Sequence, residues 1–128
     1  MVDKQYLLSD VTEQVIGCAM RVHSTLGNGF PEVIYQRTLA LELEASSILF
    51  AREKVHPVFY RDVRIGSRIV DFLIQDNLLL ELKATSELTD SHFAQIINYL
   101  TAFRLEVGLL INFGQKSLQY RRFIKTKS

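Results

Sequence analysis

The sequence has few of the residues on which specialised structural classes depend. It contains one cysteine, two prolines, six glycines and no tryptophan among 128 residues. A single cysteine excludes an internal disulfide and a cysteine-based zinc cluster, so a reducing cytoplasm is the expected location. No apolar run approaches the roughly 20 residues that span a bilayer. Cys18 lies in an apolar helical pattern and is expected to be a small core residue.

The chain also lacks internal repeats, low-complexity tracts and linkers rich in proline, glycine or serine. We therefore expect one domain over residues 1–128, with a core from about residue 10 to 124. Residues 1–5 lack the basic and apolar regions of a signal peptide, which agrees with a cytoplasmic location.

Positive charge is low in total but unevenly distributed. The net charge is +1, which is small for a protein that only binds nucleic acid. Two segments are nevertheless rich in arginine: one holds Arg61, Arg64 and Arg68, and the other holds Arg121 and Arg122. The first interpretation is a solvated surface with a basic tail. The second is a phosphate-facing rim around an acidic centre.

Hydrophobic periodicity and turn residues predict an α/β fold. The elements expected in chain order are helices at 9–26 and 31–45, an extended segment at 48–60, strands at 69–74 and 78–83, a helix at 89–103, and strands at 107–113 and 118–124. Turns are expected at 61–62 and near residue 66. This order predicts an α/β sandwich with a central mixed sheet flanked by helices.

Individual residues are expected to start, end or limit these elements. Ser9 or Asp10 should cap the first helix, and the segment from Gly27 to Gly29 should end it. Pro31 suits the first turn of the second helix. Pro57 donates no hydrogen bond, so its strand should lie at an edge of the sheet or contain a bulge.

The segment 78–83 carries charge inside an apolar run. Its leucines are typical of a buried strand, yet Glu81 and Lys83 interrupt them and point to the same face, because side chains alternate along a strand. A three-residue loop at 75–77 would place Asp71 directly opposite Glu81, with side-chain roots about 5 Å apart. A two-residue loop would send the two acids to opposite faces. We expect the three-residue loop, with Asn77 in the left-handed conformation.

Burying these charges costs several kcal/mol unless they are paired or bind a metal. Two close carboxylates repel each other unless one is protonated or a cation lies between them. All-oxygen ligands suit Mg²⁺ or Mn²⁺. Lys83 could then orient or help deprotonate an attacking water, or stabilise charge on a phosphate. The alternative is a cross-strand pair of a lysine and a glutamate, with Asp71 as a surface acid near a turn.

Polar residues on the helices suggest further members of a site. Glu32 lies beside the apolar face that Tyr35 helps to form, and it is either a site residue or an N-terminal helix cap. Gln95 and Tyr99 share one helix face, and they are either site residues or boundary residues of an amphipathic helix. His23 ends the first helix and is expected to be a C-cap partner.

Taken together, these residues resemble the PD-(D/E)XK nuclease superfamily. The match is Asp71 followed by Glu81-Leu82-Lys83, which corresponds to the E-x-K motif on the next strand. Val70 stands where the motif that names the superfamily has proline. The upstream acid Glu32 and the segment from Gln95 to Tyr99, which is similar to a Q-x-x-x-Y motif, add to the match.

More narrowly, the segment from Gly29 to Tyr35 is similar to the signature of the bacterial and archaeal GxxExxY proteins. Segments at 22–27, 95–100 and 108–114 are also similar to that family. The resemblance extends from about residue 10 to 124.

The resemblance implies a restriction-endonuclease-like fold and a Mg²⁺- or Mn²⁺-dependent phosphodiesterase site. Lys83 would position the attacking water, and Gln95 with Tyr99 would orient Lys83 or the substrate phosphate. The metal ligands that the resemblance implies are Asp71, Glu81, the backbone carbonyl of Leu82, and Glu32 directly or through water.

Three functions are compatible with the sequence. The leading hypothesis is a metal-dependent nuclease that hydrolyses DNA or RNA. The second is a nucleic-acid-binding or accessory subunit that keeps the fold, which the near-neutral charge favours, with Arg61, Arg64, Arg121 and Arg122 as contacts. The third is a protein-interaction module or homodimer built on the apolar helices.

Overall fold

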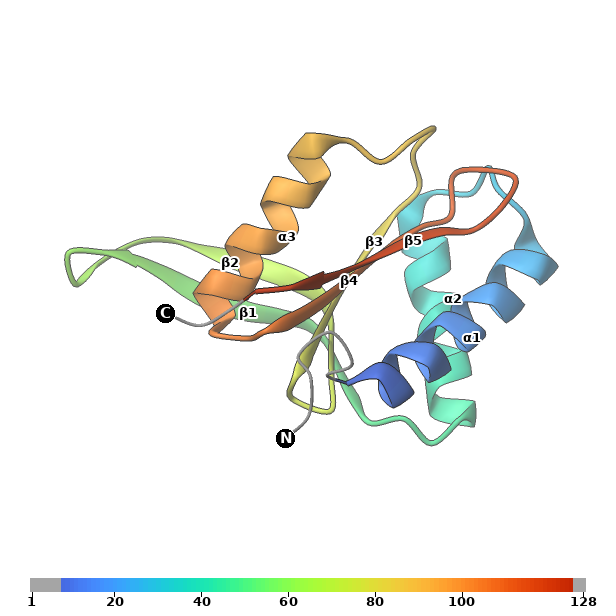
Figure 1. Ribbon diagram of the computed structural model, residues 1–128, viewed down its shortest axis with the longest axis horizontal. Helices are drawn as coiled ribbons and strands as arrows, with labels where there is room; N and C mark the ends of the chain where they lie inside the picture. The colour runs from blue at the N-terminus through green and yellow to red at the C-terminus, as the bar shows by residue number, and fades with distance from the viewer. Residues whose placement is uncertain (1–7, 126–128) are drawn as a thin grey trace.

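A computed structural model describes residues 8–125 and contains a five-stranded mixed sheet (Figure 1). The strands lie in the order β1-β2-β3-β4-β5, with β3 and β4 parallel and the other neighbours antiparallel. The expected α/β fold is confirmed. Residues 1–5, on which the prediction about a signal peptide rests, lie outside the described part of the chain. The elements are α1 (Ser9–Leu26), α2 (Glu32–Ala45), β1 (Phe50–Tyr60), β2 (Val63–Ile74), β3 (Leu78–Lys83), α3 (Asp90–Phe103), β4 (Val107–Asn112) and β5 (Gln119–Ile124).

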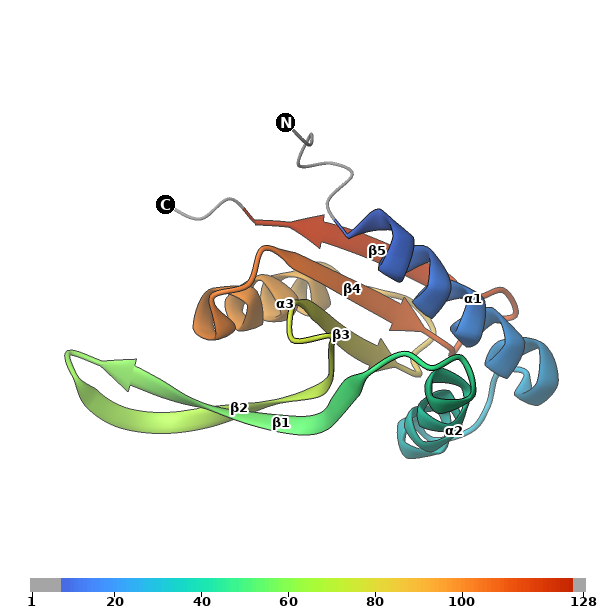
Figure 2. The same cartoon turned by 90° about the horizontal axis from the view of Figure 1, so that it is seen from below.

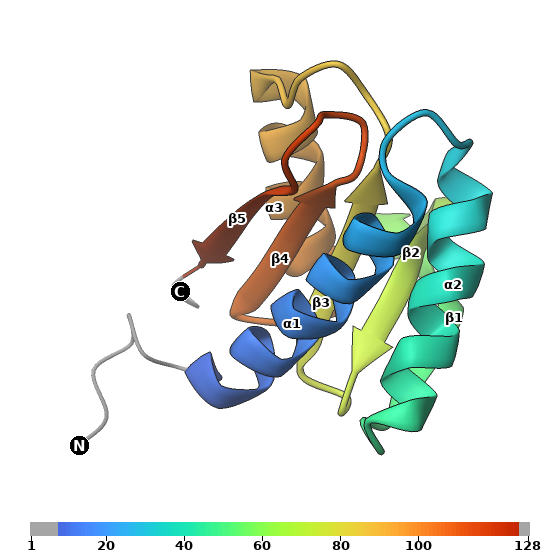
Figure 3. The ribbon, with the colours of Figure 1, turned by 90° about the vertical axis from the view of Figure 1, so that its right-hand side faces the viewer.

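Helices cover the sheet on both faces, α1 and α2 on one and α3 on the other (Figure 3). Leu80 and Leu82 of β3 pack in the cluster formed with α1 and α2, whereas Leu79 packs in the cluster formed with α3. Because side chains alternate along a strand, Glu81 and Lys83 lie on the same face as Leu79. The strand therefore presents its two charged side chains toward α3.

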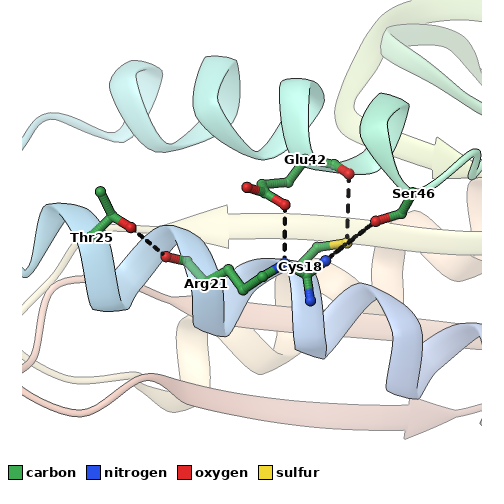
Figure 4. A network of polar contacts seen from close by, with 5 residues as sticks. All are labelled: Cys18, Arg21, Thr25, Glu42 and Ser46. Atoms are coloured by element: carbon green, nitrogen blue, oxygen red, sulfur yellow. Dashed lines mark hydrogen bonds and ion pairs between the residues drawn. The ribbon is translucent and has the colours of Figure 1, made fainter.

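The first two helices are joined by core packing and by a small polar network (Figure 4). Cys18 is buried in the core, as predicted. Arg21 donates from Nε to Glu42 Oε2 at 3.1 Å and from Nη2 to Ser46 Oγ at 3.2 Å. Exposed ion pairs of this kind contribute at most about 1 kcal/mol, so the apolar contacts hold the helix pair together.

The ends of α1 differ in part from the expected ones. Leu8 occupies the N-cap position in a left-handed conformation, and no side chain caps the helix, so the prediction that Ser9 or Asp10 caps it was wrong. Both residues lie inside the first turn, beyond the position from which a side chain accepts from the free N–H groups. Gly27 ends the helix with φ 69°, as predicted.

His23 does not serve the end of its own helix through its ring. Its Nε2 hydrogen bonds to the carbonyl of Gln115 at 2.8 Å, which joins α1 to the loop between β4 and β5. The predicted role as a C-cap partner is confirmed for the backbone of His23, whose carbonyl accepts from the N–H of Gly27 at 2.8 Å. Pro31 lies at the N-cap of α2, one residue before the expected first turn, and α3 begins at Asp90 as expected.

Strands β1 and β2 form a long hairpin that projects from the body (Figures 1 and 2). We call residues 54–69 of this hairpin the β1–β2 arm. The turn at Arg61 and Asp62 is confirmed, with φ values of 49° and 64°. The turn expected near Gly66 was wrong, because Gly66 pairs with Val58 inside a continuous strand. Pro57 lies in an edge strand just before an irregularity at Val58, as predicted.

The loop between β2 and β3 sets the register of the site. Ile74 pairs with Leu78, which confirms the three-residue loop. The left-handed residues are Gln75 and Asp76, at φ 52° and 62°, so the expectation for Asn77 was wrong. The N–H of Asn77 donates to the Ile74 carbonyl, and with positive φ at both central residues this is a type I′ turn.

A buried amide fixes the segment that follows Lys83. Asn112 is fully buried, and its Oδ1 accepts from the N–H groups of Thr85 at 2.9 Å and of Gly114 at 3.0 Å. Its Nδ2 donates to the Thr85 carbonyl at 3.0 Å and to Gln119 Oε1 at 3.1 Å. The side-chain amide of Asn112 thus forms all four hydrogen bonds of which it is capable. It holds the chain that leaves β3 to the end of β4.

Among the helices within residues 8–125, none combines the length and the hydropathy that crossing a membrane requires.

Gly114→Ala should destabilise the protein, because a Cβ at this position would overlap the backbone of Thr85. We expect a loss of about 1–3 kcal/mol in the free energy of unfolding, measured by urea denaturation. The matched control is Gly66→Ala, because a Cβ there meets no atom within 4 Å. Equal stability of the two variants would contradict the close packing of the two loops.

Candidate functional site

Strands β2 and β3 part where the acidic residues begin. Their register runs from Ile74–Leu78 to Phe72–Leu80, and beyond it side chains replace the backbone ladder. The N–H of Asp71 donates to Glu81 Oε1 at 2.9 Å, and the N–H of Leu82 donates to Asp71 Oδ2 at 2.8 Å. The expected register is confirmed up to this point, and the two carboxylates fill the gap between the strands.

Burial perturbs both carboxyl groups. Glu81 is only 5% exposed, and burial followed by the negative charge of Asp71 raises its pKa to about 8. Burial is also the main cause that raises the pKa of Asp71, against the hydrogen bond from Leu82 and the charge of Lys83. The chain by itself therefore keeps a proton on this pair at neutral pH.

Lys83 reaches the site from the same strand face and is held by α3. Its Nζ donates to Gln95 Oε1 at 2.9 Å. The charge of Lys83 lowers the pKa values of Asp71 and Glu81, so its ammonium lies near both carboxyl groups. Within the described part of the chain Lys83 forms no ion pair with a glutamate, which disfavours a simple lysine–glutamate pair.

Two more of the expected residues lie around this pair. Glu32 is at the exposed start of α2, and its pKa is raised by burial and then by the charge of Asp71. Tyr99 is 8% exposed, and its pKa is raised by burial and then by the charge of Glu81, while Arg68 lowers it. Helices α2 and α3 thus bring Glu32 and Tyr99 to opposite sides of the strand gap.

The side chains and the carbonyl at the strand gap offer a divalent cation only oxygen donors. Among residues 8–125, no group of three or more histidine, cysteine, aspartate or glutamate side chains is placed to hold a metal ion. Glu32 therefore does not complete a three-carboxylate group with Asp71 and Glu81. Two carboxylates, with the carbonyl of Leu82 between Glu81 and Lys83, form an oxygen-only set that suits Mg²⁺, which usually keeps several waters. Burial raises the pKa of both carboxyl groups, and the charge of Asp71 raises that of Glu81 further, so a cation at the pair would stabilise their ionised forms.

The structure adds two residues that sequence reasoning missed. Gln36 is buried on α2 and donates from Nε2 to Asp71 Oδ1 at 3.2 Å. Arg52 of β1 donates from Nη2 to Gln36 Oε1 at 3.0 Å. This chain of hydrogen bonds orients the carboxylate of Asp71. The only sequence signal was a polar residue directly after Tyr35 at the edge of an apolar helix face.

The arginines of the expected phosphate-facing rim do not lie on one surface. Arg61, Arg64 and Arg68 are exposed on β1–β2, and Arg68 is near Tyr99. Arg121 and Arg122 are on β5, at the other edge of the sheet. They also point to different faces, because they follow each other along one strand.

On β5, the two arginines have different surroundings. The guanidinium of Arg121 lies 4.4 Å from the ring centroid of Phe93 on α3. Arg122, by contrast, lies opposite Leu109, which belongs to the cluster with α1 and α2. Only Arg121 of these two is therefore on the face of the sheet that carries Glu81 and Lys83.

The raised pKa of Glu81 should make the protein less stable as the pH rises when no divalent metal is present. Its native pKa of about 8 exceeds the reference value of 4.5, so between these values the folded state holds a proton that the unfolded state has lost. The free energy of unfolding should therefore decrease from about pH 5 to about pH 8, on the order of a few kcal/mol. Urea denaturation in the presence of EDTA measures it.

Glu81→Gln keeps the shape of the side chain and cannot ionise, so it should flatten this pH dependence. The exposed Glu44→Gln is the matched control and should leave it unchanged. A slope in Glu81→Gln equal to that of the wild type would show that another group is responsible.

Comparisons with known proteins agree with this fold. Among solved structures, the crystal structure of SSO0001 is similar to the chain, with a TM-score of 0.61 and 16% sequence identity. The similarity covers 98% of this chain and 62% of that one, so the chain spans less than two thirds of the longer protein. At this identity the likeness concerns the fold alone. No protein of curated function matches the chain in sequence.

The sequence itself gives the more specific result. The model of the PD-(D/E)XK nuclease superfamily matches residues 9–123, which include every helix and strand of the described fold except the last residue of β5, and thus the parted strands with Asp71 and Glu81. This chain belongs to the PD-(D/E)XK nuclease superfamily.

Proposed function

We propose that this chain is a metal-dependent nuclease that hydrolyses phosphodiester bonds in DNA or RNA. The observation that carries the proposal is the buried pair of Asp71 and Glu81 beside an ammonium that Gln95 holds in place. Buried carboxyl groups with raised pKa values beside a lysine ammonium that is held in place are typical of catalytic sites. Membership of the superfamily supports the same reaction.

Each residue has a role that follows from its place. Asp71, Glu81 and the carbonyl of Leu82 would hold Mg²⁺ or Mn²⁺, and Glu32 would add a contact through water. A bound divalent cation would polarise the phosphate and acidify a coordinated water. Glu81 must lose its proton to act as a ligand, which makes cation binding depend on pH.

The remaining residues act on the water and the phosphate. The ammonium of Lys83, fixed by Gln95 at 2.9 Å, would position the attacking water and stabilise charge that develops on the phosphate. Tyr99, beside Glu81, would orient the substrate phosphate together with Gln95. Gln36 and Arg52 would keep the Asp71 carboxylate in the orientation that accepts the Leu82 N–H.

The narrower assignment to the prokaryotic GxxExxY proteins is also part of this proposal, and the loop before α2 supports it. Gly29 has φ 112°, a conformation that favours glycine. Tyr35 donates its hydroxyl to the Gly27 carbonyl at 2.6 Å and accepts from the Phe30 N–H at 3.2 Å. The glycine and tyrosine of the signature therefore shape the turn from which Glu32 enters the site.

Nucleic acid is the partner that the proposal requires, with Arg61, Arg64, Arg68 and Arg121 as contacts and Arg122 as a contact on the other face. A cytoplasmic location, a single domain and a possible homodimer remain predictions from the sequence. Experiment can distinguish the nuclease from the accessory-subunit alternative, because an accessory subunit should bind nucleic acid in a salt-dependent way without cleaving it.

Wild-type protein with Mn²⁺ should cleave at least one member of a panel of single-stranded, duplex and branched DNA and RNA. Asp71→Ala and Lys83→Ala should each lower the cleavage rate by about a hundredfold or more, because each removes charge stabilisation from the site. Product formation on denaturing gels measures the rates.

The exposed Lys116→Ala, in the loop between β4 and β5, is the matched control for the loss of one lysine and should cleave like the wild type. If the wild type leaves the whole panel intact and still binds it, the accessory-subunit alternative replaces the nuclease. Cleavage that survives in Lys83→Ala would place the reaction elsewhere on the chain.

A further inference from the structure

The tip of the β1–β2 arm exposes apolar side chains that the carboxylate site does not use. Phe59, Tyr60, Val63 and Ile65 each expose 59–65% of their surface. They surround the turn at the point of the hairpin that lies farthest from the body of the protein (Figures 1 and 2). A cluster of exposed apolar side chains on a folded protein is often a binding surface.

Each face of this tip combines an aromatic ring with an arginine. Phe59 lies directly opposite Arg64, so the two share one face. Tyr60 follows Phe59 and therefore points to the other face. There the guanidinium of Arg61 lies 5.3 Å from the centroid of the Tyr60 ring. The tip thus offers the same chemical pair twice, once on each side of a thin two-stranded ribbon.

The charge of the tip selects among partners. Within residues 8–125, no carboxylate forms an ion pair with Arg61 or Arg64. A second copy that met this tip with its own tip would bring like charges together, which is costly. Unpaired nucleotides supply both complements, because a base stacks on an aromatic ring and its phosphate pairs with an arginine.

We propose that the tip of the β1–β2 arm lies between two parted strands of nucleic acid, one strand on each face, and that the substrate is therefore forked or branched. This inference rests on the proposed function, because a nuclease site at the base of the arm makes nucleic acid the partner. The strand from Arg61 to Asp71 spans roughly 30 Å. That length corresponds to about nine base pairs of duplex between the fork and the scissile phosphate.

The decisive measurement is the affinity for a forked duplex, a blunt duplex of the same sequence and a single strand, by fluorescence anisotropy in EDTA. The wild type should bind the fork more tightly than the other two. Phe59→Ala and Tyr60→Ala should each weaken fork binding about five- to a hundredfold, and the double variant should bind fork and duplex alike.

The matched control is Val55→Ala on the stem of the arm. Val55 is 51% exposed and lies opposite Ile69, away from the turn at the tip, so this variant should keep the preference for the fork. The proposal is overturned if the wild type binds fork and duplex equally, or if both tip variants keep the preference. It is also overturned if the wild type sediments as a dimer that Tyr60→Ala dissociates.

This experiment separates the two proposals because binding in EDTA needs no cleavage. A protein that cuts its substrate in Mn²⁺ but binds fork and duplex alike loses the arm assignment and remains a nuclease. A protein that prefers forks through Phe59 and Tyr60 but cuts no substrate loses the nuclease assignment instead.

Discussion

The cost of burying two carboxylates at one point of a sheet governs the chemistry of this protein. Asp71 and Glu81 lie where β2 and β3 stop pairing, and their oxygens accept the N–H groups that the missing ladder would have satisfied. Those bonds and the charge of Lys83 offset only part of the burial, since the pKa of Glu81 is still raised to about 8. The negative charge of the pair is therefore only partly compensated, and a divalent cation compensates it better than a proton.

The rest of the fold holds this arrangement in place from several directions. Arg52 and Gln36 fix the Asp71 carboxylate from the α2 side, and Gln95 fixes Lys83 from the α3 side. Asn112 anchors the segment after Lys83 through two hydrogen bonds to Thr85, and its other two, with Gly114 and Gln119, fix the amide itself. Groups held in this way need little rearrangement when charge develops during a reaction, which is what electrostatic catalysis requires.

The sequence predicted the order of elements and the core of the site because those depend on local patterns. Leucines interrupted by Glu81 and Lys83 revealed a charged strand face, and counting across a three-residue loop placed Asp71 near Glu81. The continuation of β2 through Gly66 and the N-cap at Leu8 were missed, because strand pairing and tertiary packing override the local preferences of glycine and serine. Gln36 could not be recognised because its role exists only after α2 packs beside β2.

Calorimetric titration of the wild type with Mn²⁺ at pH 7, in two buffers of different ionisation enthalpy, measures whether the carboxylate pair binds a cation. We expect cation binding that releases protons, since Glu81 must ionise to become a ligand. In Glu81→Gln the binding should weaken and the proton release should disappear. Absence of Mn²⁺ binding, or binding without proton release that Glu81→Gln leaves unchanged, would contradict the central claim.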